Sequence, residues 1–206
     1  MKLGDVIYVN KEWEHFIEKV LFVSIFLIIT LITNTTSAQL QPIENNSLFL
    51  HYINETTGLS IEVPNWKVGD KRDNRTLLLY GDFACIEITV TDDITESLNL
   101  PNSLNYATES DFNYFKTLAM QEMENLGIGE PVNPNIKIGN QQGHKVVIFN
   151  CSYIGKSTNK KYLFFGFVFL EKGRIHTITS QCEELWANIV YPNYLIPFGY
   201  SIKFLW

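Results

Sequence analysis

Three histidines that follow residue 38 are the side chains of this chain best suited to acid–base or metal chemistry: His51, His144 and His176. None of them belongs to an HxH, HExxH or Cys/His pattern, the spacings that bring metal ligands together. His144 and His176 would meet across strands only if the sheet curves. Surface or strand positions are the simpler interpretation, so the sequence predicts no catalytic, no cofactor-binding and no metal-ligating residue.

Adjacent carboxylates occur at Asp92-Asp93 and at Glu183-Glu184. A calcium loop needs alternating acidic residues around a glycine turn, and the first pair lacks that glycine. These pairs are predicted to be a solvated loop and a helix start.

Glycines do not form a catalytic or phosphate-binding pattern either. There is no Gly-x-Ser-x-Gly nucleophile elbow and no phosphate-binding glycine loop, and the pair Gly127 and Gly129 is better interpreted as a helix stop. An aromatic group near the C-terminus is a candidate platform for a sugar or a peptide. Its members are Trp186, Tyr191, Tyr194, Phe198 and Tyr200. Packing of a helix on the core explains it more simply.

The three cysteines Cys85, Cys151 and Cys182 match neither a CxxC redox pair nor a zinc cluster. The predicted strands place Cys151 opposite Leu163, and Cys182 opposite Lys161 or Tyr162, with a whole strand between the two cysteines. Neighbouring strands are about 4.8 Å apart, so the two alpha carbons would be about 9 to 10 Å apart, beyond the reach of a disulfide. We therefore expect no bridge between Cys151 and Cys182.

An apolar run, Val20 to Ile32, dominates the N-terminal region. Lysines precede it and the small polar residues of TNTTSA follow it, the order of a secretory signal peptide. A membrane-crossing helix needs roughly 20 apolar residues, which the run reaches only by including that polar tail. We expect residues 1–38 to be a signal peptide or an N-terminal membrane anchor, and the protein to be extracytoplasmic, secreted or anchored.

The composition indicates that the rest of the chain is one mildly acidic domain. The full sequence has 16 Lys and Arg against 22 Asp and Glu, a formal net charge of −6. Nucleic-acid binding needs clustered basic residues, and the densest group, Lys71, Arg72 and Arg75, is interrupted by Asp70 and Asp73. We therefore exclude nucleic acid as a partner and expect membrane contact only through the N-terminal segment.

Residues 39–47 are polar and aperiodic, which predicts a short linker before a domain at 48–206. Alternation of apolar and polar residues predicts strands. Polar stretches, prolines and glycines between them predict the turns. The predicted strands are 59–63, 77–80, 84–90, 136–138, 145–153, 161–170, 174–181 and 200–205. Residues 91–110 are predicted to be a long surface loop.

Two helices are predicted. The first begins at Ser110 or Asp111 and ends at Gly127, with apolar residues spaced by three and four. Its stripe is Phe112, Phe115, Leu118, Ala119, Met123 and Leu126. The second runs from Glu183 to Tyr191 and is ended by Pro192.

The strand Tyr162 to Leu170 decides the predicted architecture, because both of its alternating sets of side chains are apolar. A strand of this kind must be covered on both faces. The sequence therefore predicts an α+β fold, an antiparallel β-sheet covered by helices on both faces in an α/β/α sandwich. A sheet with helices on one face and long loops on the other is the alternative.

Tyr52 to Trp66 (YINETTGLSIEVPNW) contains an aromatic residue, a glycine, an alternating strand, and then Pro and Trp. This order resembles the opening pattern of the PsbP family, which includes the extrinsic lumenal subunit of photosystem II. The hairpin strand Cys85 to Val90, the aromatic hairpin Tyr162 to Ile178 and the closing strand Ser201 to Phe204 add to it. The resemblance covers about residues 48–205 and carries no functional residue.

The resemblance implies a non-enzymatic binding or accessory module, and together with the export signal it predicts an exported protein of this kind at the cell envelope. It implies no cofactor, and its partner would be an envelope or extracellular protein of unknown identity. Photosystem binding and retention of calcium and chloride are not transferred to this chain. Two alternatives stay open: a metal-dependent hydrolase that uses His144 or His176 with a nearby carboxylate, and a small-molecule carrier that uses the concave face of the sheet.

Overall fold

The structure is a computed structural model that describes residues 39–43, 46–69, 77–91, 98–124, 130–156 and 158–205. The predicted leader, the basic turn at residues 70–75, the Asp92-Asp93 pair and the two glycines at 127 and 129 lie outside these ranges. Among the residues described, no helix is long and apolar enough to cross a bilayer. Residues Ala38–Trp206 form one compact unit.

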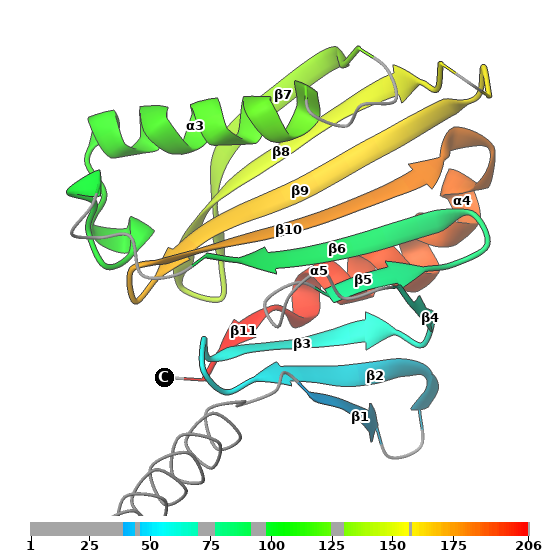
Figure 1. Cartoon of the computed structure of the whole chain (residues 1–206), viewed down its shortest axis with the longest axis horizontal. Coiled ribbons are helices and arrows are strands. Elements are labelled where there is room, and N and C mark those ends of the chain that lie inside the picture. The colour runs from blue at the N-terminus through cyan, green and yellow to red at the C-terminus, as the bar shows by residue number, and fades with distance from the viewer. Residues whose placement is uncertain are drawn as a thin grey trace, which may run out of the picture. The chain divides into compact units, whose positions relative to one another are not determined.

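Two antiparallel sheets build this unit (Figure 1). The larger sheet has seven strands in the order β4-β5-β6-β10-β9-β8-β7, and the smaller has four in the order β1-β2-β3-β11. The strands of the larger sheet are β4 (Lys67–Val68), β5 (Leu77–Tyr80), β6 (Ala84–Val90), β7 (Val132–Gln141), β8 (His144–Ile154), β9 (Lys161–Glu171) and β10 (Arg174–Glu183). The predicted α+β class with antiparallel strands is confirmed, but the sequence did not predict a second sheet.

Tight two-residue turns set the register of β7 against β8 and of β9 against β10. Gln142 and Gly143 have φ of 49° and 89°, and Lys172 and Gly173 have φ of 48° and 74°. Two successive residues with positive φ make the two-residue turn whose twist matches that of the flanking strands. The bounds of β8, β9 and β10 therefore differ from the predicted ones by only one or two residues.

The smaller sheet corrects the predicted linker at residues 39–47. Its strands are β1 (Gln39–Ile43), β2 (Asn46–Asn54), β3 (Leu59–Pro64) and β11 (Lys203–Phe204). β1 pairs with β2 from Gln39↔Ile53 onward. Because β1 is an edge strand and mostly exposed, its backbone pairs without the apolar alternation that marks a half-buried strand.

Helix α3 (Glu109–Glu124) buries Phe112, Phe115, Ala119 and Met123 of the predicted stripe. Leu118 is half-buried, and Leu126 lies outside the described residues. Its cap lies earlier than predicted, because Thr108 and Asp111 form a reciprocal capping box. The Thr108 hydroxyl accepts a hydrogen bond from the Asp111 amide at 3.3 Å, and Asp111 Oδ2 accepts one from the Thr108 amide at 2.7 Å. The predicted caps, Ser110 and Asp111, are therefore wrong.

The predicted surface loop at residues 91–110 is also wrong in part. The short 3-10 helix η1 (Leu104–Tyr106) lies within it, and its Leu104 side chain is fully buried. Leu104 is one of several scattered apolar residues in this stretch, and the sequence does not distinguish the one that is buried.

The C-terminal region corrects the second predicted helix. Strand β10 continues to Glu183, and four short helices follow: η2 (Glu184–Trp186), α4 (Ala187–Val190), a π-helical stretch η3 (Tyr191–Leu195) and α5 (Ile196–Ser201). Pro192 does not end the helix, because it lies in the first turn of η3, where a missing amide donor is tolerated. Residues 184–201 are called the C-terminal helical segment below.

Two hydrophobic clusters lie on opposite faces of the large sheet. The first is formed under α3 by side chains that include Phe115, Phe149 and Val168. The second joins the other face to residues of the small sheet, such as Leu59 and Ile61, and to residues of the C-terminal helical segment. The prediction that helices cover both faces is therefore not confirmed, because the small sheet also packs against the second face. Both clusters lie within Ala38–Trp206, so this unit contains the cores that independent folding requires.

Candidate functional site

A groove runs along the second face of the large sheet, beside the C-terminal helical segment. Two adjoining hollows of about 370 Å³ each form it, and they share the side chains of Phe165 and Tyr191. Ile148, Phe165 and Phe167 of β8 and β9 line its sheet side, and Tyr191, Leu195, Ile196, Gly199 and Tyr200 line its helical side. Its volume is in the range of small-molecule binding sites.

At one end of the groove, amide side chains from the β7–β8 turn bond to backbone carbonyls of α5. Gln141 Nε2 donates to the Gly199 carbonyl at 3.1 Å, and Gln142 Nε2 donates to the Tyr200 carbonyl at 2.9 Å. These bonds hold α5 against the end of the hairpin. The amide donors at this end are therefore already engaged.

The other end carries polar side chains for which no partner is observed among the described residues. Asn133, Asn150 and Ser152 line it, and no hydrogen bond of these side chains to another described residue is observed. Tyr191 lies where the two hollows meet, and burial raises the pKa of its hydroxyl, which stays a protonated donor. No charged residue lines either hollow.

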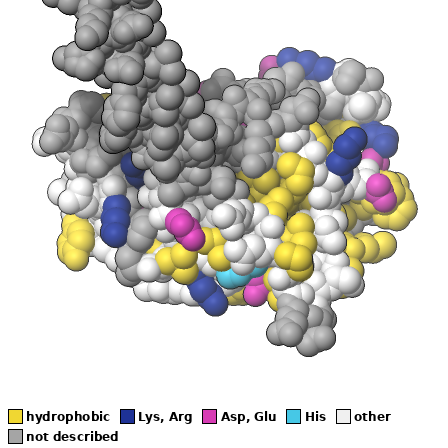
Figure 2. Space-filling model, turned by 60° about the horizontal axis from the view of Figure 1, so that its bottom comes forward, with side chains coloured by type: hydrophobic (Ala, Val, Ile, Leu, Met, Phe, Trp, Pro, Cys, Tyr) yellow, Lys and Arg dark blue, Asp and Glu magenta, His cyan; other side chains and the backbone are white. Residues whose placement is uncertain are grey.

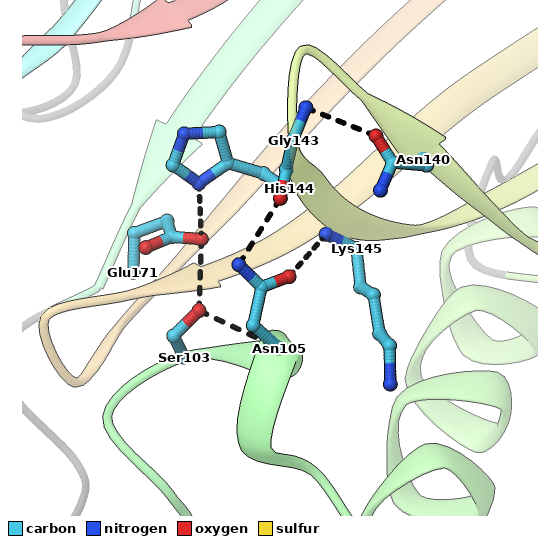
Figure 3. A network of polar contacts seen from close by, with 7 residues as sticks. All are labelled: Ser103, Asn105, Asn140, Gly143, His144, Lys145 and Glu171. Atoms are coloured by element: carbon cyan, nitrogen blue, oxygen red, sulfur yellow. Dashed lines mark hydrogen bonds and ion pairs between the residues drawn. The ribbon is translucent and has the colours of Figure 1, made fainter.

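A second feature is a polar network between the end of β9 and the start of β8 (Figure 3). His144 Nδ1 lies 2.8 Å from Glu171 Oε1, and the Ser103 hydroxyl donates to the same oxygen at 3.0 Å. Glu171 is buried, with its side chain 7% exposed, while the His144 side chain is 22% exposed. The carboxylate is thus the shared acceptor of two donors.

Asn105 completes this network, because its side-chain amide bonds to the backbone of β8 as a neighbouring strand would. Its side-chain oxygen accepts from the Lys145 amide at 2.7 Å, and its Nδ2 donates to the Gly143 carbonyl at 3.1 Å. The Ser103 backbone meanwhile pairs with Glu171 as an isolated bridge. Residues 103–105 therefore fill the place where β8 and β9 separate, as Figure 3 shows.

The order of groups in this network differs from that of a hydrolytic triad. In a triad the histidine lies between serine and carboxylate and takes the serine proton. Here Glu171 lies between Ser103 and His144, so the serine hydroxyl is directed at the carboxylate and away from the histidine. The arrangement fastens a loop to the sheet.

His176 is apart from this network and fully buried on β10. Both of its ring nitrogens lack a hydrogen-bond partner, and burial, with a smaller contribution from Arg174, lowers its pKa to about 3. The Phe204 ring lies 5.0 Å from the ring centres of both His144 and His176. The structure thus brings His144 to a carboxylate, Glu171, but gives His176 none among the described contacts.

The remaining residues considered for chemistry make local hydrogen bonds or surface ion pairs. His51 Nε2 lies 2.7 Å from the Ser60 hydroxyl within the small sheet. Glu183 and Glu184 form ion pairs with Lys160 and Lys161 at 2.8 and 2.6 Å. In the described ranges, no group of three or more His, Cys, Asp or Glu side chains is placed to hold a metal ion.

The cysteines are all free thiols. Cys151 lies opposite Phe164 and Cys182 opposite Leu163, a shift of one or two residues from the predicted register. They belong to the clusters on opposite faces of the sheet, which agrees with the prediction that they do not bridge. Burial raises the pKa of each to about 11, so both stay protonated and unreactive at neutral pH.

The predicted aromatic platform divides into packed and groove-lining members. Trp186 stacks on Phe83 with ring centres 4.1 Å apart, and Tyr194 packs on Trp66 at 5.5 Å. Tyr191 and Tyr200 instead line the groove. These two tyrosines were the only signal in the sequence that pointed toward it.

On the face shown in Figure 2, basic side chains lie at the margins, apart from one another or beside acidic ones. Hydrophobic side chains gather nearer the middle and at one side of the same face. This distribution offers no continuous basic surface for a phosphate backbone on the face in view.

Solved structures were compared with this fold. The solution structure of cyanobacterial PsbP (CyanoP) from Synechocystis sp. PCC 6803 matches with a TM-score of 0.55 and 12% identity, over 78% of this chain and 94% of that one. The chain has a PsbP-like fold. The predicted resemblance is therefore confirmed at the level of structure.

The PsbP-like unit has a weaker match to LpqN, described as involved in cell envelope biogenesis of Mycobacterium tuberculosis. That match has a TM-score of 0.43 and 11% identity, over 78% of this chain and 93% of LpqN. No protein-family model and no curated protein sequence matches the chain.

Proposed function

We propose that this chain is an exported, non-enzymatic PsbP-like protein that binds a ligand or partner at the cell envelope as an accessory factor. The groove beside the C-terminal helical segment carries the proposal. It combines an apolar lining with unpartnered polar groups at one end, and no acid–base pair or charged side chain lines it. A surface of this kind suits binding without turnover.

The location is proposed on the apolar run Val20 to Ile32, which has the order of an export signal or anchor. The PsbP-like fold is compatible with an accessory role. We therefore expect the protein on the outer side of the cytoplasmic membrane, either released or held by its N-terminal segment.

Capture of the tagged full-length chain from its own host tests this function. The informative comparison is between Ile196→Lys and Ile189→Lys. Both isoleucines are in the C-terminal helical segment and are similarly exposed, 48% and 54%, but only Ile196 lines the groove. We expect an identified envelope component to be recovered with the wild type and Ile189→Lys and to be lost with Ile196→Lys.

Recovery of the intact chain, initiator methionine included, from the cytosolic fraction would contradict the proposed location. Equal recovery of the component with both variants would contradict the role of the groove.

The alternative of a metal-dependent hydrolase rests on the 2.8 Å contact between His144 and Glu171. Elemental analysis of purified residues 38–206 distinguishes it from the binding function. A stoichiometric transition metal that is lost in His144→Ala would favour the hydrolase.

A further inference from the structure

We propose that the groove binds a single-chain amphiphile with an uncharged polar headgroup, with the headgroup at Asn133, Asn150 and Ser152. This inference rests on the proposed binding function and specifies its ligand. Neither the fold nor the comparisons assign a ligand.

The shape of the groove calls for an elongated ligand. Its hollows reach from Val132 to Gln141, the two ends of β7. Ten residues of strand span about 30 Å at about 3.3 Å per residue. Phe165 and Tyr191 line both hollows, so one chain can lie across them without a break.

The polarity of the groove orients that ligand. At the Gln141 end, the amide donors are bonded to the carbonyls of Gly199 and Tyr200. At the opposite end, Asn133, Asn150 and Ser152 line the groove and make no observed side-chain bond to another described residue. A headgroup with hydroxyls satisfies such groups, and an apolar tail would then lie against Ile148, Phe165 and Phe167.

The absence of charge in the lining favours a neutral headgroup. A charged group transferred from water into this groove would find no opposite charge to offset its lost hydration. Lys161, at the start of β9, is already paired with Glu184 at 2.6 Å. Amide and hydroxyl groups bind a hydroxylated head without that loss.

Three ligands with the same twelve-carbon length test the inference on purified residues 38–206. These are 1-monolauroylglycerol, laurate and dodecyltrimethylammonium, titrated by calorimetry below their aggregation concentrations. We expect monolauroylglycerol to bind at least tenfold more tightly than either charged ligand. Equal or tighter binding of laurate or of the ammonium would overturn the neutral headgroup.

Three variants locate the bound ligand. Ile196→Lys is expected to weaken monolauroylglycerol binding at least tenfold, and its matched control Ile189→Lys less than twofold. Asn150→Leu is expected to weaken it severalfold, and unchanged binding would overturn the assigned orientation. Thermal unfolding of each variant checks that the unit is folded.

The two proposals fail in different ways. If no twelve-carbon ligand binds but an envelope component is still lost only with Ile196→Lys, this inference is wrong and the accessory function stands. If that component is also recovered equally from both isoleucine variants, the groove has no binding role and both proposals fall.

Discussion

The two faces of strand β8 differ in how completely they are closed. Phe149 points under α3 and is fully buried, whereas its neighbour Ile148 is only half-buried and lines the groove. On the α3 face, side chains fill the space so tightly that a Cβ on Gly166 would lie within 3 Å of the Phe149 ring. The comparison separates a face built for stability from one with room for a ligand.

The same contrast applies to polar groups. At the Glu171 network, donors and acceptors are paired within the protein, and their geometry serves to fasten a loop. At the open end of the groove, Asn133, Asn150 and Ser152 make no observed side-chain bond to another described residue, so they are free to bond to the proposed headgroup.

The largest expected effect tests the closed face. Phe149→Ala should lower the free energy of unfolding by about 3–5 kcal/mol, because it leaves a cavity between α3 and the sheet. Ile148→Ala is the neighbouring control and should cost less than half as much, since its side chain is partly solvated. Urea denaturation measures both, and equal costs would remove the distinction between the faces.

His176 tests whether water is excluded from the second face of the large sheet near Phe204. Its pKa is about 3 in the folded protein and near 6.5 when unfolded, so the unfolded chain binds the proton more tightly. Stability should therefore fall as the pH drops below about 6.5, by up to about 1.4 kcal/mol per pH unit. His176→Leu should remove this contribution to the pH dependence of the free energy of unfolding. Urea titrations between about pH 7 and about pH 4 measure it. Identical slopes for the two proteins would show that water reaches the imidazole.

Glu171→Ala sharpens the contrast between satisfied and free polar groups. The change leaves the Ser103 hydroxyl and His144 without their acceptor and should cost about 1–3 kcal/mol. The exposed Glu184, paired with Lys161, is the matched control and should cost less than about 1 kcal/mol on replacement by alanine. Chemical denaturation decides, and a cost for Glu171→Ala as small as the control's would mean that the network adds no stability.

The smallest expected effect concerns the helix that closes the α3 face. Thr108→Ala removes the capping hydroxyl and should cost about 1 kcal/mol, while Thr108→Ser should retain most of the stability. Thr117, whose hydroxyl bonds to a carbonyl on the exposed side of the same helix, gives a control substitution to alanine. A loss at Thr117 equal to that at Thr108 would argue against the capping box.

Local patterns in the sequence predicted the large sheet well. Strands β8 to β10 follow one another through short turns, and apolar alternation fixes which residues face each cluster. The helix stripe Phe112 to Met123 was predicted for the same reason. Edge strand β1 was missed because backbone pairing, and not side-chain burial, holds most of it in place.

The groove could not be predicted, because it depends on where two distant segments lie. The apolar residues on both sides of β9 correctly indicated cover on both faces, but Phe165 is only half-buried, and that opening is not a local property. Pro192 gave a misleading signal as well. A proline ends a helix only where its missing donor is needed, and the order of short helices after Glu183 is set by contacts with the core.

The central position of β10 has a consequence for the order of assembly. Strands β7 to β10 are neighbours both in the sequence and in the sheet, so they can pair through contacts that are close along the chain. In contrast, β6 pairs with β10 across a long loop, with Val90 opposite His176. Closing such a loop costs chain entropy before any contact repays it, and such steps are slow. Strands β7 to β10 are thus expected to form first. The edge of β6 that pairs with β10 stays unpaired until β10 has been synthesised.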